Sequence, residues 1–259
     1  MPRWAAFPHD ASAFRRTLPA LKKAWPRLHR GDAEPWPLSK DVQQAWALFH
    51  AGEFQAAFDA GLAEGSAAGL TVANKAQAIH ATYLQRSEAQ RLAGLQAVAQ
   101  RARALAASQP GCANAHYWLA YALGRYSQGI SITQALAQGL GHQVKAALET
   151  TIELAPRHAD AHTALGMFHA EVIDKVGPLL GAVQGADAAT GLAMLERGLA
   201  LNPDSAIAMI ECANGLVMLQ GHDGLPRAEA LYARAAALTP ADAMECLDIE
   251  LAKAELADD

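Results

Sequence analysis

The chain has 259 residues and a net charge of −5, a balance that excludes the strongly basic footprint of a nucleic-acid-binding protein. Hydrophobic residues make up 52% of it but aromatic residues only 6%, because much of the apolar content is alanine. Alanine is the strongest helix former, and runs of β-branched residues at period two are nearly absent. The composition therefore predicts an all-α fold, and the length is enough to bury a substantial core.

The first predicted element is an amphipathic helix over residues 11–30, with Phe14, Leu21 and Trp25 on its apolar side and a break or kink at Pro19. Residues 1–31 hold seven Lys or Arg and one acidic residue, Asp10. The tail 242–259 has the opposite balance, with seven Asp or Glu and one basic residue, Lys253. A solvated capping face and a contact with a partner or membrane surface both fit this charge pattern. We predict residues 1–37 to be a basic N-terminal capping helix and linker.

Four later segments share a repeat. Each has a proline directly after one predicted helix and an alanine three residues further on, where the next helix begins. Proline cannot extend the first helix but is tolerated at or before the start of the second, so each repeat is predicted as helix, proline turn, helix. The prolines are Pro110, Pro156, Pro203 and Pro240, and the alanines are Ala113, Ala159, Ala206 and Ala243.

The helices before Pro203 and Pro240 carry a small residue, a larger one and another small one at the same offsets: Gly191, Leu195 and Gly198 in the first, and Ala228, Tyr232 and Ala235 in the second. This pattern resembles the tetratricopeptide repeat, over roughly residues 38–256 and most strongly over 141–245. The resemblance implies an all-α, right-handed solenoid of helical hairpins over 38–259. Its expected units are 38–70, 71–109, 110–155, 156–202 and 203–239, followed by a C-terminal helix at 240–257.

The proline spacings of 46, 47 and 37 residues exceed the family period of about 34. Two apolar, glycine-punctuated insertions are therefore predicted between the helices of their units, at 127–142 and 172–188. Long insertions of this kind resemble the regulator of microtubule dynamics family and a repeat-protein partner of bacterial periplasmic-binding transporters. The absence of an apolar signal segment at the start argues against the exported partner, and the expected location is the cytoplasm.

In the tetratricopeptide family, one face of each first helix lines a concave groove that binds protein or peptide partners. A groove filled by the protein's own insertions is the alternative. The lysine–asparagine–lysine–arginine clamp that some members use for a peptide's terminal carboxylate is missing, apart from Asn214. The resemblance places these residues in the groove: Asn114, Tyr117, Tyr121, Arg125, Asp160, Thr163, Met167, Glu171 and Asn214.

Three histidines, His158, His162 and His169, are close enough in sequence to suggest a metal site. Two of them, His162 and His169, occupy the positions where the family has packing aromatic residues. We therefore expect histidines that pack in the core, with a ring nitrogen bonded to a neighbouring carbonyl.

Three functions remain open. The sequence favours a non-catalytic scaffold that binds a protein partner, with no cofactor, metal or nucleic acid. A binder of a hydrophobic small molecule or lipid, in a pocket roofed by 127–142 and 172–188, is the second hypothesis. A metal-dependent enzyme that uses the three histidines is the third. The sequence does not indicate an oligomeric state.

Overall fold

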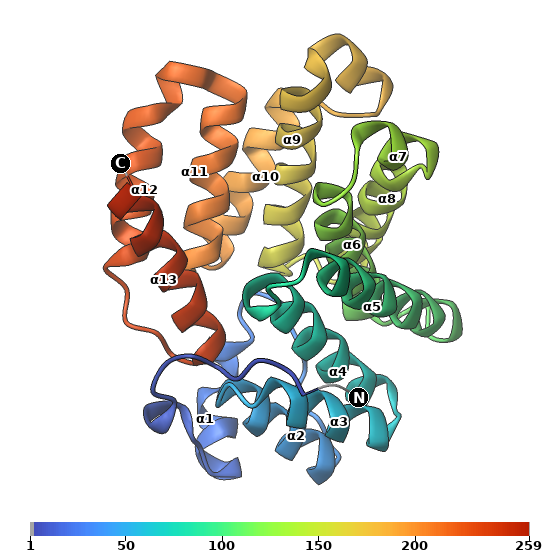
Figure 1. Cartoon of the computed structure of the whole chain (residues 1–259), viewed down its shortest axis with the longest axis vertical. Helices are drawn as coiled ribbons and strands as arrows, with labels where there is room; N and C mark the ends of the chain where they lie inside the picture. The colour runs from blue at the N-terminus through green and yellow to red at the C-terminus, as the bar shows by residue number, and fades with distance from the viewer. Residues whose placement is uncertain (1–2, 259) are drawn as a thin grey trace. The chain divides into compact units, whose positions relative to one another are not determined.

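The computed structural model describes residues 3–258, and these residues form helices joined by turns, with no β-strand among them (Figure 1). The all-α prediction is confirmed. Short helical turns lie at Ser12–Phe14, His80–Leu84 and Gly221–Gly224. The α-helices are α1 (Leu18–Leu28), α2 (Lys40–His50), α3 (Phe54–Glu64), α4 (Ala67–Ile79), α5 (Glu88–Ser108), α6 (Ala113–Gln128), α7 (Ile132–Ala137), α8 (Leu140–Leu154), α9 (Ala159–Val183), α10 (Ala188–Leu201), α11 (Ala206–Gln220), α12 (Leu225–Ala236) and α13 (Ala243–Asp258).

The chain divides into two compact units. Unit 1 contains the chain up to His29, Glu34–Leu140 and Ala241–Met244, and so holds α1 to α7. Unit 2 contains Arg30–Ala33, Gly141–Pro240 and the chain from Glu245 onward, and so holds α8 to α12 and most of α13. None of the helices in the described residues is both long enough and apolar enough to cross a membrane.

The proline–alanine repeat marks the helix starts as the sequence predicts. Each of the four alanines is the first residue of a helix, namely α6, α9, α11 and α13. The proline three residues earlier lies in the turn between helices, where no intrahelical hydrogen bond needs the N–H that proline lacks. The helices after these turns gain further N-terminal hydrogen bonds where a side chain is present to accept them. Ser205 accepts one from Ala208 N in α11.

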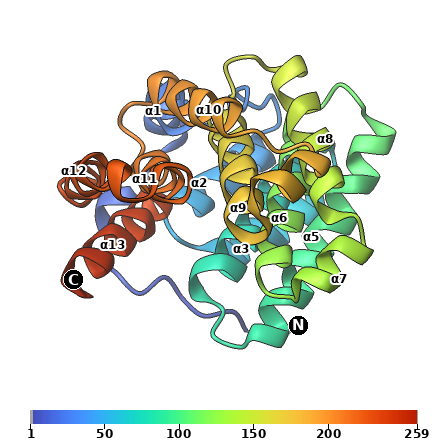
Figure 2. The same ribbon diagram turned by 90° about the horizontal axis from the view of Figure 1, so that it is seen from above.

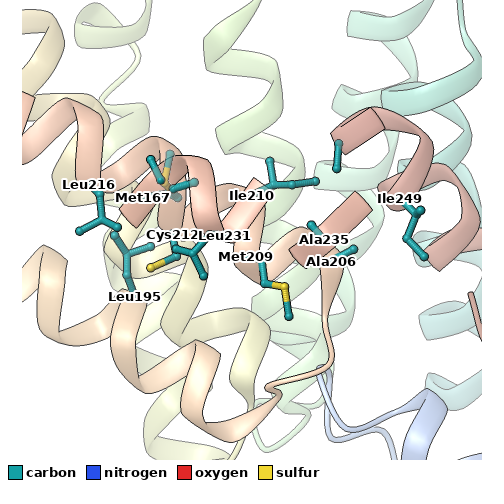
Figure 3. Packing of buried hydrophobic residues seen from close by; sticks show 13 residues of the cluster. Met167, Leu195, Ala206, Met209, Ile210, Cys212, Leu216, Leu231, Ala235 and Ile249 are labelled. Atoms are coloured by element: carbon teal, nitrogen blue, oxygen red, sulfur yellow. The ribbon is translucent and has the colours of Figure 1, made fainter. Parts of the chain in front are cut away.

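Unit 2 is built around α11, which packs against α9, α10 and α12 (Figure 2). Its core is a continuous cluster of buried aliphatic and sulfur-bearing side chains (Figure 3). Leu195 from α10, Met209 and Leu216 from α11, and Ile249 from α13 are all less than 3% exposed. Burying side chains of this size stabilises a fold by about 1.5–3 kcal/mol each.

Small residues bring α9 and α10 into close contact. At Gly166 an added Cβ would lie 2.6 Å from Leu195 Cγ and 2.9 Å from the carbonyl oxygen of Gly191. At Gly198 an added Cβ would lie 3.0 Å from the backbone nitrogen of Thr163. Only a glycine fits at either crossing point, which explains the small residues of the repeat pattern in physical terms.

Unit 1 packs α4 against α2, α3, α5 and α6. Its largest buried side chains include Trp46 and Phe49 from α2 and Ile79 from α4, each 0% exposed. The segment before α1 lies on this unit through aromatic contacts. The Trp4 ring stacks on His80 with 4.5 Å between centroids, and it also contacts Phe58 at 5.0 Å.

The N-terminal helix is shorter than the sequence predicts. Residues 12–14 form one 3₁₀ turn, Arg15 and Thr17 are extended, and α1 begins only at Leu18. Pro19 is therefore in the first turn of the helix and not in its interior, because that is where proline's fixed φ and missing N–H are tolerated. The expectation of a single helix over residues 11–30 is wrong in this respect. Leu21 and Trp25 are buried, as the amphipathic pattern indicates.

Both predicted insertions lie between the two helices of a repeat. The first contains the six-residue helix α7, which begins with a capping box at Ser131 and Gln134. In the second, α9 is interrupted at Gly177, whose φ of 78° and ψ of 164° are not helical. The chain then continues as a short helical segment whose Leu179, Leu180 and Val183 are 86%, 63% and 78% exposed. Glycine allows this break because a residue with a Cβ would be strained at that φ.

Candidate functional site

The half-buried face of α6 in unit 1 carries Tyr121 and Arg125, one helical turn apart. The Tyr121 hydroxyl donates a hydrogen bond to Thr82 Oγ1 at 3.1 Å. The Arg125 guanidinium carbon lies 5.6 Å from the centre of the Tyr121 ring, and its Nη1 donates to Gln128 Oε1 at 3.3 Å. These contacts hold a ring and a guanidinium together in a fixed orientation, a pair suited to contact with another protein.

The other two predicted residues of α6 lie in the interior. Asn114 is 5% exposed and its Nδ2 donates to Glu34 Oε2 at 2.5 Å. Tyr117 is 6% exposed, and its ring meets Trp118 edge-on with 5.0 Å between centroids. Their burial means that Tyr121 and Arg125 are the two predicted residues of α6 that a partner can reach.

In unit 2 the predicted residues of α9 are divided between the interior and the surface. Thr163 is buried and its hydroxyl donates to the carbonyl of Ala159 in the preceding turn. Met167 is buried in the core cluster shown in Figure 3. Asp160 and Glu171 are half-buried. The stripe expected to line the groove on α9 therefore contains two side chains that contribute to packing.

Two of these surface residues have structural contacts of their own. The backbone N–H of Asp160 donates to the carbonyl of Gly31 at 3.0 Å, so the linker segment Arg30–Ala33 is attached to the start of α9. On α11, Asn214 Oδ1 accepts a hydrogen bond from the Tyr232 hydroxyl at 2.7 Å, and Asn214 itself is half-buried.

The histidines predicted as packing residues have structural hydrogen bonds. The imidazole Nε2 of His162 lies 3.1 Å from the carbonyl oxygen of Pro156. In the preceding repeat, His116 Nε2 lies 2.9 Å from the carbonyl oxygen of Pro110. The same offset of six residues recurs because both histidines occupy the same position of their helices. The bond to a neighbouring carbonyl is the arrangement that the repeat position predicts.

The remaining two histidines of the three have different partners. His158 Nδ1 accepts from Ala161 N and so caps α9, while His169 Nδ1 accepts from the backbone N–H of Asp187, both at 3.1 Å. His169 is buried as expected, but the partner of this nitrogen is an N–H group and not the predicted carbonyl. Burial lowers the pKa of His169, and the nearby Lys145 lowers it further. Across the described residues, no group of three or more His, Cys, Asp or Glu side chains is arranged to hold a metal ion.

Unit 1 contains a buried polar network that the sequence did not indicate. His50 Nδ1 lies 2.6 Å from Asp242 Oδ2, and His50 Nε2 lies 3.2 Å from His29 Nε2. The three residues are at most 4% exposed. They come from α2, the end of α1 and the segment before α13, so no local pattern in the chain connects them. Because the network is buried, a substrate cannot reach it.

The insertion at 127–142 borders a shallow depression of about 660 Å³. Its lining includes Glu88 and Leu92 from the start of α5, and Ile130, Ser131 and Gln134 from the insertion. Four of the eight lining residues are polar, and the depression is open to solvent. It offers little of the apolar enclosure that a hydrophobic ligand requires.

Comparison with known proteins agrees with the repeat architecture. The sequence profile of the family described as regulator of microtubule dynamics protein 1-3 matches residues 70–175, from α4 to the first part of α9. No curated protein matches the chain. The crystal structure of a thermophilic TPR protein from Thermus thermophilus superposes with a TM-score of 0.57 at 19% identity, over 83% of this chain and 97% of that one. The predicted tetratricopeptide-like fold and the resemblance to the microtubule-dynamics family are confirmed.

Proposed function

We propose that this protein is a non-catalytic scaffold that binds a protein partner, and that α6 of unit 1 contributes Tyr121 and Arg125 to the binding surface. The supporting observation is the ordered ring–guanidinium pair, 5.6 Å apart and half-buried, on a tetratricopeptide-like fold. Tyrosine and arginine are among the side chains that contribute most to binding at protein interfaces. A pair already held in place loses less conformational entropy on binding than two mobile side chains do.

The partner interaction can be tested by quantitative affinity capture. The wild-type protein and the double variant Tyr121→Ala, Arg125→Ala are immobilised and exposed to the same cell lysate, and captured proteins are measured by mass spectrometry. Loss of two such contacts should weaken capture of the specific partner about tenfold or more. Arg234→Ala, which removes an exposed arginine of α12 in unit 2, is the matched control and should capture normally.

Two results would contradict this assignment. One is undiminished capture by the double variant. The other is a large fall in its melting temperature, which would show that the two side chains are part of the core and are not a binding surface.

A hydrophobic small molecule or lipid is the second candidate ligand, and one observation favours it. The segment after Gly177 exposes three apolar side chains close together in the chain, Leu179, Leu180 and Val183. Single exposed apolar residues are common on protein surfaces, whereas a cluster of them is typical of a binding site. Native mass spectrometry of the purified protein distinguishes the two functions. A co-purifying lipid or metabolite would support the ligand-binding function, and a mass equal to that of the polypeptide would support the scaffold.

The proposed location is the cytoplasm. The three cysteines, Cys112, Cys212 and Cys246, are unpaired, which suits a reducing compartment. Burial raises the pKa of Cys212 to about 11, so this thiol remains protonated and unreactive at neutral pH.

A further inference from the structure

Arg101 of α5 is a half-buried guanidinium held in place by neutral groups. Its Nε donates to Asn74 Oδ1 at 2.7 Å and its Nη2 donates to Gln77 Oε1 at 2.5 Å. Both acceptors are on α4, three residues apart and therefore on one face of that helix. The guanidinium carbon also lies 5.2 Å from the centre of the Phe58 ring on α3. The orientation of the guanidinium plane is thus set by three helices of unit 1.

The positive charge of Arg101 has no negative counterpart in the described part of the chain. Its contacts there are the two amide oxygens and the aromatic ring, and no carboxylate is among them. Burial lowers the pKa of the guanidinium to about 10, and burial is the sole cause. A charge that is partly removed from water without an ionic partner costs free energy, whereas a neutral glutamine could make similar hydrogen bonds without that cost.

Two nitrogen atoms at this site have no hydrogen-bond acceptor in the part of the protein that the structure describes. Arg101 Nη1 has no partner among the described residues, and it is not one of the fully buried atoms, so solvent reaches it. Asn74 is 0% exposed and its Nδ2, next to the oxygen that Arg101 uses, is buried without a partner. Asn74 Nδ2 is thus a buried donor without an acceptor, while Arg101 Nη1 faces solvent, the side from which a ligand can approach.

We propose that Arg101 is the anchor of a carboxylate-binding site on unit 1. A guanidinium fixed in a plane matches the two oxygens of a carboxylate, and its orientation needs no further ordering on binding. The site supplies one positive charge without an ionic partner, so it binds one carboxylate group of its ligand. The lysine of the neighbouring helix α4, Lys75, lies over the rings of Trp46 and Phe49 and does not share the Phe58 contact of Arg101.

The carboxylate can belong to a small organic acid or to an acidic side chain of a peptide. The half-buried Trp4 ring, which contacts the buried Phe58 ring, supplies an apolar border beside the charge. This site uses none of the residues of the α6 surface. A negative result for the Arg101 site therefore does not affect the proposed partner surface on α6, and the reverse also holds.

Titrations followed by NMR at the arginine Nε–H resonances test the site directly. The probes are acetate, a tetraglutamate peptide with blocked ends and inorganic phosphate, each added to the full-length protein at constant ionic strength. We expect acetate or the peptide, or both, to shift the Arg101 resonance in a saturable manner, and phosphate to bind more weakly. The stronger of the two carboxylate probes identifies the source of the ligand.

Two variants separate a binding site from a purely structural role. Arg101→Gln should weaken binding of the carboxylate probe at least tenfold. Arg103→Gln, which changes an exposed arginine of the same helix, should leave it unchanged. Equal binding by wild type and Arg101→Gln would overturn the proposal, as would preference for phosphate or the absence of a saturable shift with both carboxylates. The resonance shift in the wild-type protein decides the question even if Arg101→Gln does not fold.

Discussion

Substitution of Gly166 by alanine tests the close contact between α9 and α10. The added Cβ would lie 2.6 Å from Leu195 Cγ and 2.9 Å from both the Gly191 oxygen and the Leu195 nitrogen. Two of these three atoms are backbone and cannot rotate away, so the helices must separate. Overpacking of this kind costs about 1–3 kcal/mol, and the backbone contacts place this case at the upper end. Alanine regains about 1 kcal/mol of helix propensity, so the expected net loss is about 2 kcal/mol.

Gly124 in α6 is the matched control. It lies inside a helix like Gly166, but a Cβ added there meets nothing within 4 Å. Gly124→Ala should therefore stabilise unit 1 by about 0.5–1 kcal/mol, through helix propensity alone. The two substitutions are chemically identical and are expected to have opposite signs.

Urea denaturation can follow the two units separately. The five tryptophans, at positions 4, 25, 36, 46 and 118, all lie in unit 1, so tryptophan fluorescence reports the Gly124 variant. Far-UV circular dichroism includes unit 2 and reports the Gly166 variant. A Gly166→Ala protein that unfolds at the same or a higher urea concentration than wild type would refute the close-packing argument.

Two further predictions concern the buried histidines. Asp242→Ala removes the acceptor next to His50 Nδ1 and leaves a buried polar group unpaired, which should destabilise unit 1 by about 1–3 kcal/mol. Tryptophan fluorescence in urea measures this loss, and the exposed Asp59→Ala of the same unit should change the midpoint little; an equal midpoint for both would show that the network contributes no stability. The pKa of His169 is lowered in the folded state by burial and by Lys145, so the unfolded chain binds the proton more readily. The stability that the neutral ring contributes should therefore be present above pH of about 6.5 and lost as the pH falls below it. Urea midpoints of unit 2 at pH 7.5 and 5.5 should differ less in His169→Gln than in wild type, and an unchanged pH dependence would show that another group is responsible.

The repeat architecture could be predicted because its signals are local. The proline cannot continue one helix and the alanine three residues later begins the next, so the starts of α6, α9, α11 and α13 follow from short stretches of chain. The histidine at the packing position of the repeat is equally local, and His162 bonds to the carbonyl of Pro156 within the same turn. The N-terminal helix begins later than predicted, because its amphipathic pattern starts before the point where Pro19 allows a helix to begin.

The candidate site depended on side-chain burial, which the repeat pattern does not specify. Asn114 and Tyr117 share the predicted face of α6 with Tyr121, yet both are buried. The position of a residue on a helix sets its direction, but the neighbours that cover it come from distant parts of the chain. For Asn114 the covering group is Glu34, eighty residues earlier.

The sequence by itself determined the helical class, the repeat and the places where insertions interrupt it, since each depends on residues a few positions apart. The tertiary structure alone decided which polar groups meet. His50 meets Asp242 from 192 residues away and His29 from 21, and Arg101 reaches Asn74 across 27 residues. Such pairs leave no periodic signal, because hydrogen bonds between helices depend on how the helices pack and not on their spacing in the chain.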